Sequence, residues 1–202
     1  MSYAAKRTQG TAGQPLFLTF HGTGGNESQF HGFAETLMPQ ANITSPRGDV
    51  SEFGALRYFK RTGEGVYDMD DLRLRTDAMA AFIRSEMAKT GASRVIGLGY
   101  SNGANILASV ALGHPDLVDD LVLMHPLIPW TPAPQPGLAN KRIMITAGER
   151  DPICPAPLTR DLEDYFADQG AQVSTIWHSG GHEIVQSEID AIVGFLSQKA
   201  AA

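Results

Sequence analysis

The chain has 202 residues, a formal net charge of −6 and a composition that is 43% hydrophobic and 19% charged. These values are ordinary for a folded globular protein and exclude a disordered chain. The acidic balance argues against nucleic acid or an anionic membrane surface as the main partner. A single cysteine, Cys154, excludes an internal disulfide.

Short apolar runs alternate with helical patterns along the chain. After an irregular or edge-strand segment over 1–14, the predicted elements are a strand over 16–20, a helix over 28–38, a strand over 42–46, a helix over 70–89, a strand over 94–98, a helix over 102–112, strands over 120–124 and 141–147, a helix over 155–168, a strand over 172–177 and a helix over 183–197. This alternation favours an α/β fold with a mostly parallel central sheet of about six to seven strands and helices on both faces. Because no linker or internal repeat interrupts the pattern, we expect one domain over residues 1–202.

Two segments between the predicted elements are long for connections. Residues 47–68 carry aromatic side chains among charges, and residues 126–140 contain five prolines, which prevent a regular helix. Long ordered loops are often functional, although surface decoration is an equal alternative.

Ser101 lies in the most informative motif of the chain. Gly99-x-Ser101-x-Gly103 follows a predicted strand and opens a predicted helix, which is the pattern of a nucleophile elbow. A strand that turns directly into a helix strains its middle residue, so the neighbours two positions away must lack bulk. A phosphate-binding turn is the alternative, but Gly97, Gly99 and Gly103 are spaced one residue too far for a dinucleotide fingerprint.

A serine nucleophile needs a base, and the base needs an acid that orients it. Asp151 and His182 each follow a predicted strand, at the edge where open α/β sheets place their chemistry. The chain order serine, acid, histidine is that of α/β hydrolases. Glu149 competes with Asp151 for the acid role, and Asp151 is favoured. His178 competes with His182 for the base role, and His182 is favoured because two glycines let its loop reach back to Ser101. We predict a triad of Ser101, Asp151 and His182.

The segment His21-Gly22-Thr23-Gly24-Gly25 follows the first predicted strand, where hydrolases supply an oxyanion-binding N–H. We expect the backbone N–H groups of Thr23 and Asn102 to form the oxyanion hole. The other residues expected around the substrate pocket are His21, Tyr58, Phe59, His125 and Ile153. No H-E-x-x-H motif occurs, so we expect neither a metal nor another cofactor.

The chain resembles the α/β-hydrolase superfamily, and within it the small bacterial phospholipase/carboxylesterase branch. The motifs that carry the resemblance are HGTGGN (21–26), GYSNGAN (99–105), GERDP (148–152) and GGHE (180–183). The stretch from Arg47 to Asp68 is similar to that of MhqD-like hydrolases. The resemblance extends over nearly the whole chain and implies ester hydrolysis by the predicted triad. The proline-rich segment leaves no room for a helical cap, so we expect an open site partly walled by residues 47–68.

We therefore expect a cytoplasmic serine carboxylesterase for small to medium carboxylic esters, with no membrane span and the option of a homodimer. A thioesterase or lysophospholipase-type hydrolase is the alternative, although related acyl-protein thioesterases carry glutamine where this chain has Asn102. A dienelactone hydrolase of the usual kind carries cysteine where this chain has Ser101. A non-catalytic binding or sensor protein with the same fold is the alternative from another class.

Overall fold

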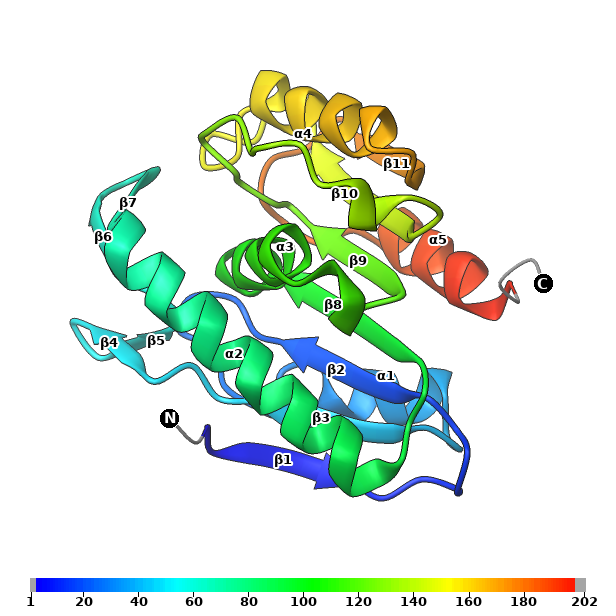
Figure 1. The fold of residues 1–202 in the computed structure, drawn as a ribbon. Helices are drawn as coiled ribbons and strands as arrows, with labels where there is room; N and C mark the ends of the chain where they lie inside the picture. The colour runs from blue at the N-terminus through cyan, green and yellow to red at the C-terminus, as the bar shows by residue number, and fades with distance from the viewer. Residues whose placement is uncertain (1–2, 199–202) are drawn as a thin grey trace.

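A computed structural model of the protein describes residues 3–198, and within them seven strands form one sheet in the order β1-β3-β2-β8-β9-β10-β11 (Figure 1). These strands are β1 (Ala5–Thr8), β2 (Leu16–Phe20), β3 (Asn42–Pro46), β8 (Val95–Tyr100), β9 (Asp120–Met124), β10 (Arg142–Gly148) and β11 (Gln172–His178). β1 pairs antiparallel with β3, and the other neighbours in the sheet pair in parallel. The sheet confirms the α/β architecture predicted from the alternating pattern.

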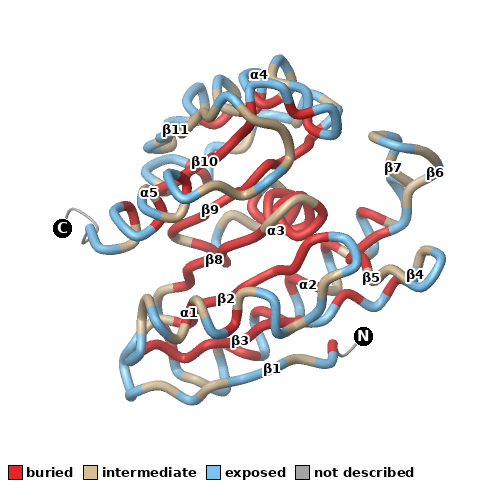
Figure 2. The backbone as a smooth tube through the Cα atoms, turned by 180° about the vertical axis from the view of Figure 1, so that it is seen from behind, coloured by how far each residue is buried: buried red, intermediate tan, exposed pale blue. Residues whose placement is uncertain are grey.

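Helices cover both faces of this sheet (Figure 1). They are α1 (His31–Leu37), α2 (Met69–Thr90), α3 (Asn102–Gly113), α4 (Ala156–Asp168) and α5 (Gln186–Ser197). One apolar core joins the sheet to α2, α3 and α4, and a second joins the opposite face to α1 and α5. β2 shows why: Leu16 and Leu18 belong to the first core and Phe17 to the second, because successive side chains of a strand point to opposite faces. Figure 2 shows the buried backbone concentrated in the central strands.

The structure corrects the predicted course of residues 47–68. They form two short hairpins, β4 (Val50–Glu52) with β5 (Ala55–Arg57) and β6 (Arg61–Gly63) with β7 (Val66–Tyr67). Strands of two or three residues are too short to show an alternating pattern, so the sequence does not reveal them. Both hairpins lie near the carboxyl end of β2, on the side of the sheet where the elbow is found (Figure 1).

The last helix begins three residues later than predicted, at Gln186 instead of residue 183. Glu188 accepts a hydrogen bond from the Val185 N–H at 2.7 Å, which fixes the first turn of α5. Residues 179–185 are therefore a loop, and this loop carries His182.

Between β9 and β10 the described chain forms a loop whose only helical element is one 3₁₀ turn, Pro136–Leu138. No helical cap stands there, in agreement with the stiffness expected from the prolines. Among the described residues, no helix is both long and apolar enough to cross a membrane.

Candidate active site

Ser101 lies in the sharp turn between β8 and α3, with φ 52° and ψ −119°. This left-handed region is rare for residues with a side chain, so the turn stores strain. A Cβ atom at Gly99 would lie 2.5 Å from the carbonyl oxygen of Gly103, and one at Gly103 would lie 2.5 Å from that of His21. The two glycines of the motif are therefore required by close backbone contacts.

The three predicted triad residues meet at the carboxyl edge of the sheet. His182 Nε2 lies 2.9 Å from Ser101 Oγ, and His182 Nδ1 lies 2.7 Å from Asp151 Oδ2. An ionised carboxylate only accepts hydrogen bonds, so Nδ1 carries the proton of the neutral ring. Nε2 is then the nitrogen that can accept the proton of the Ser101 hydroxyl.

The buried carboxylate of Asp151 is held from both sides. Oδ1 accepts the backbone N–H groups of Ile153 at 2.8 Å and Cys154 at 2.9 Å, and Oδ2 accepts from His182 and His125. Burial alone would raise the pKa of Asp151, but these hydrogen bonds outweigh burial and lower its pKa. Asp151 is therefore anionic at neutral pH.

The two competing residues lie elsewhere. Glu149 is exposed in the loop after β10. His178 ends β11, and its Nε2 lies 3.7 Å from Glu188 Oε2, away from Ser101. The structure thus brings Asp151 and His182 to the serine and leaves the other two apart.

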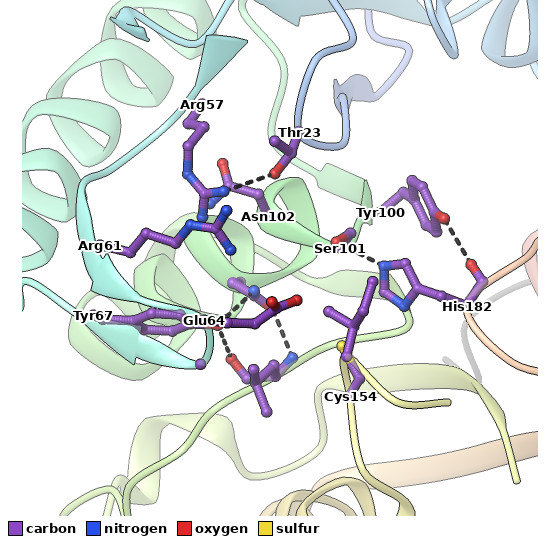
Figure 3. Close-up of a pocket in the computed structure, with 14 residues that line it drawn as sticks. Thr23, Arg57, Arg61, Glu64, Tyr67, Tyr100, Ser101, Asn102, Cys154 and His182 are labelled. Carbon is purple, nitrogen blue, oxygen red and sulfur yellow. Dashed lines mark hydrogen bonds between the residues drawn. The ribbon is translucent and has the colours of Figure 1, made fainter. Parts of the chain in front are cut away.

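A cavity of about 290 Å³ opens beside Ser101, and both Thr23 and Asn102 line it (Figure 3). Asn102 is the first residue of α3, so its N–H lies outside the helical hydrogen-bond ladder. The Asn102 side chain faces the other way: its Oδ1 accepts the Tyr58 N–H at 2.8 Å. Asn102 therefore anchors the 47–68 segment to the elbow, which is an additional role for the residue after the nucleophile.

One wall of the cavity is charged. Arg57 Nη1 donates to Thr23 Oγ1 at 3.1 Å and to Glu52 at 3.3 Å, while Arg61 Nε lies 3.0 Å from both oxygens of Glu52. Figure 3 shows both guanidinium groups and the Glu64 side chain among the residues that line the cavity. The opposite wall is formed by Leu127, Ile153 and Cys154.

Four of the five predicted pocket residues do not line this cavity. Tyr58 and Phe59 are fully buried in the core, where Phe59 packs on Tyr67 with ring centroids 4.8 Å apart. His125 is also fully buried, behind Asp151. Only Ile153, which is 38% exposed, reaches the cavity. The prediction of Tyr58 and Phe59 as pocket wall is wrong, because the stretch between the two hairpins turns both side chains into the core.

His21 is the fourth residue that is displaced from its predicted place. Its Nδ1 donates to Gly22 O at 2.8 Å, and its Nε2 accepts the Gly48 N–H at 2.9 Å. The Tyr58 hydroxyl completes the junction, because it accepts the His21 N–H and donates to Pro46 O. Burial lowers the pKa of His21, in keeping with a neutral ring. His21 therefore joins the Thr23 loop to the 47–68 segment.

Asn105 joins the walls of the cavity to α3. Its Nδ2 donates to the Tyr67 hydroxyl at 2.8 Å, and its Oδ1 accepts the Leu127 N–H at 2.7 Å. The Tyr67 hydroxyl donates in turn to Leu127 O at 2.9 Å. One polar triangle thus fixes the β6–β7 hairpin and the proline-rich loop relative to the elbow.

Tyr67→Phe is expected to lower the free energy of unfolding by about 1–3 kcal/mol, because it leaves an amide donor and a carbonyl acceptor of the triangle unsatisfied. Tyr165→Phe is the matched control: it removes an exposed hydroxyl bonded to Ala133 O at 2.7 Å and is expected to cost less than about 1 kcal/mol. Urea unfolding of both variants measures the difference. Equal losses would contradict a structural role for the triangle.

Several residues of the site are not identified by the motifs. Arg57, Arg61 and Tyr67 reach the cavity only because the hairpins fold over the elbow, and Cys154 contributes a buried thiol whose Sγ donates to His125 O at 3.1 Å. Burial raises the pKa of Cys154, so it stays a neutral thiol.

The donor atoms of His125, Asp151 and His182 lie within 4.8 Å of one another, as a metal site requires. The separations of 2.7 and 3.0 Å between nitrogen and oxygen are ordinary hydrogen-bond distances, so protons account for this geometry. The expectation of a site without a metal stays a prediction.

The sheet, the strained serine and the open carboxyl edge are those of an α/β hydrolase. A model of the dienelactone hydrolase family matches residues 60–195, and the chain belongs to this family. MhqD of Bacillus subtilis (strain 168) is 40% identical over 185 residues, which cover 90% of this chain and 92% of MhqD. These findings confirm the resemblance to MhqD-like α/β hydrolases.

Solved structures agree with this assignment. Atu2452 from Agrobacterium tumefaciens str. C58, a protein described as of unknown function, is 56% identical with a TM-score of 0.92, and the match covers 96% of each chain. A Bacillus cereus carboxylesterase is 31% identical with a TM-score of 0.88, covering 96% of this chain and 93% of the other. Hydrolase chemistry of the dienelactone hydrolase and carboxylesterase type follows.

Proposed function

We propose that the protein is a serine carboxylesterase that hydrolyses small to medium carboxylic esters. The observation that carries this proposal is the continuous hydrogen-bonded chain from Ser101 through His182 to Asp151, with distances of 2.9 and 2.7 Å. The likeness to the Bacillus cereus carboxylesterase supports it.

The proposed reaction begins when Ser101 Oγ attacks the ester carbonyl and His182 Nε2 takes the hydroxyl proton. The N–H groups of Thr23 and Asn102 bind the oxygen that becomes negative. Asp151 accepts a hydrogen bond from the Nδ1–H of His182 throughout, stays ionised and stabilises the imidazolium. His182 then gives its proton to the leaving alcohol. Water next attacks the acyl-enzyme with His182 as the base, and the carboxylic acid is released from Ser101.

The size and charge of the cavity favour short-chain esters over the long acyl chains of the lysophospholipase-type alternative. Its volume of about 290 Å³ and its charged wall of Arg57, Arg61 and Glu64 disfavour a long acyl chain. We expect kcat/KM for p-nitrophenyl acetate and butyrate to exceed that for the laurate by about tenfold or more. A panel of esters and thioesters of graded length measures this preference. A maximum at long acyl chains would favour the lysophospholipase-type alternative, and a preference for thioesters would favour a thioesterase.

A non-catalytic binding protein with the same residues is the alternative from another class. Labelling with a fluorophosphonate separates the two, because this probe reacts only with an activated serine. A folded protein that is neither labelled nor active on the panel would favour the binding protein. A cytoplasmic location and a homodimer stay predictions from the sequence.

A further inference from the structure

His125 has no part in the proposed reaction, yet it lies directly behind the triad. It follows β9 with φ 49°, a strained value for a residue with a side chain. Its backbone N–H donates to Thr146 O at 2.8 Å, and its side chain is fully buried. Strain at a buried histidine indicates that the surrounding structure holds the ring in a required place.

Both ring nitrogens of His125 face a buried carboxylate. Nδ1 lies 3.0 Å from Asp151 Oδ2, and Nε2 lies 3.0 Å from Glu188 Oε1. A neutral imidazole has only one N–H, so it could donate to one of these oxygens and would direct a lone pair at the other. Two ionised carboxylates therefore require both nitrogens to carry a proton, which makes the ring an imidazolium.

The electrostatics agree with this charge state. Burial alone would lower the pKa of His125, but its hydrogen bonds to Glu188 and Asp151 outweigh burial and raise its pKa. Burial alone would raise the pKa of Glu188, but the His125 ring, the Thr146 hydroxyl and the Val185 N–H together outweigh burial and lower it. The two buried anions and the buried cation thus stabilise one another.

Glu188 is itself held in place. Its Oε2 accepts the Val185 N–H at the start of α5, so the helix aims the carboxylate at His125. Several titratable groups surround the His125 ring. They are Tyr100 of β8, Asp151 after β10, His178 of β11, His182 in the following loop and Glu188 of α5. Glu183 also interacts electrostatically with His125, and the Cys154 thiol contacts the His125 carbonyl oxygen.

The His125–Glu188 pair acts on the triad through the carboxylate of Asp151. Its Oδ1 takes two backbone N–H groups, and its Oδ2 takes one N–H each from His182 and His125, so all four acceptor positions are filled. A carboxylate bound in this way cannot rotate away from His182. We propose that His125 and Glu188 are positioning residues: their buried ion pair keeps Asp151 ionised and aimed at His182. This inference rests on the proposed function of the triad.

The charge state can be tested in the unmodified protein. In ¹⁵N spectra of protein labelled at histidine, both ring nitrogens of His125 are expected to stay protonated from about pH 6 to about pH 8. The signals of His125 are identified as those that are missing from the spectrum of the His125→Gln variant. One unprotonated His125 nitrogen in this pH range would overturn the proposal, whatever the variants do.

The matched pair for the carboxylate is Glu188→Gln and Asp190→Asn, because each removes one negative charge from α5. Asp190 is exposed and bonded to Gln186 on the outer side of the helix. In Glu188→Gln, His125 is expected to lose its second proton at a lower pH than in the wild type. In Asp190→Asn, the titration of His125 is expected to stay unchanged. An unchanged titration in both variants would overturn the role of Glu188.

The kinetic signature separates positioning from packing. His125→Gln is expected to lower kcat by about 10- to 100-fold while KM changes by less than about threefold. The acid limb of its kcat/KM profile is expected to move to higher pH, because the protonated base is no longer repelled by a second imidazolium whose ring centroid lies 5.1 Å away. A lowered kcat with an unmoved acid limb would show that His125 only packs.

Ser101→Ala, measured in parallel, keeps the two proposals apart. If Ser101→Ala abolishes ester hydrolysis while His125→Gln keeps the wild-type pH profile of kcat/KM, then the proposed triad is supported and the positioning role of His125 is contradicted. If Ser101→Ala retains full activity, then the proposed function falls, and the spectra still decide the charge of His125.

Discussion

Alanine at position 101 is expected to lower kcat/KM for p-nitrophenyl acetate by about 10⁴-fold or more and to abolish fluorophosphonate labelling. The reason is that Ser101 Oγ is the proposed nucleophile and lies 2.9 Å from Nε2 of the proposed base, His182. The fold should be unaffected, since the elbow strain lies in the backbone and alanine keeps the Cβ atom. Steady-state kinetics and circular dichroism measure the two effects.

Ser109→Ala is the control for this variant, because it makes the same change in α3, the helix that Ser101 precedes. Ser109 is buried and its hydroxyl is 2.7 Å from that of Thr76, away from the cavity beside Ser101. It is expected to keep full labelling and most of the activity. Hydrolysis at the wild-type rate by Ser101→Ala would show that another group performs the reaction.

Gly148→Ala is expected to destabilise the protein by about 3 kcal/mol and to reduce kcat by about 10²-fold. A Cβ atom at this last residue of β10 would overlap the carbonyl oxygen of Gly181 and would lie 2.7 Å from that of Gly180. Both contacts are with backbone, which has little freedom to yield. The loop that carries His182 would have to move, and the base would leave Ser101. Urea unfolding and ester kinetics measure the two losses.

Gly194→Ala separates this contact from the general effect of replacing glycine. Gly194 lies in α5 with no atom near the position of a Cβ, so alanine there is expected to stabilise the helix by about 0.5–1 kcal/mol with unchanged kinetics. Wild-type activity in Gly148→Ala would mean that the loop is placed by other contacts, such as the hydrogen bond of Tyr100 to His182 O at 2.7 Å.

The order of the large elements could be predicted from the sequence because buried strands and amphipathic helices leave strong local patterns. The elbow and its partners followed from the steric demand on Gly99 and Gly103 and from chain order. The two hairpins could not be predicted, since their strands are too short to carry a pattern. The inward turn of Tyr58 and Phe59 depends on contacts far away in the chain, such as the Tyr58 hydroxyl on Pro46 O.

The buried pair behind the triad was missed for a related reason. A glutamate on a helix ordinarily faces solvent, yet Glu188 is fully buried. One local signal was available: a glutamate three residues after Val185 is the spacing at which a side chain closes the first turn of a helix. That signal predicts the cap, whereas the ion pair with His125 arises only when α5 packs against β10 and β11 and brings Glu188 to the residue that follows β9.

β11 lies at one end of the sheet order, and its seven residues are all exposed or half-buried. The proposed base and the glutamate behind it both lie in the 20 or so residues that follow this strand, whereas the nucleophile rests on β8 in the centre. Edge elements open locally at a lower cost than central ones. The proposed catalysis therefore depends on residues that follow an edge strand, so local unfolding at this edge is expected to abolish turnover while the centre of the sheet stays folded.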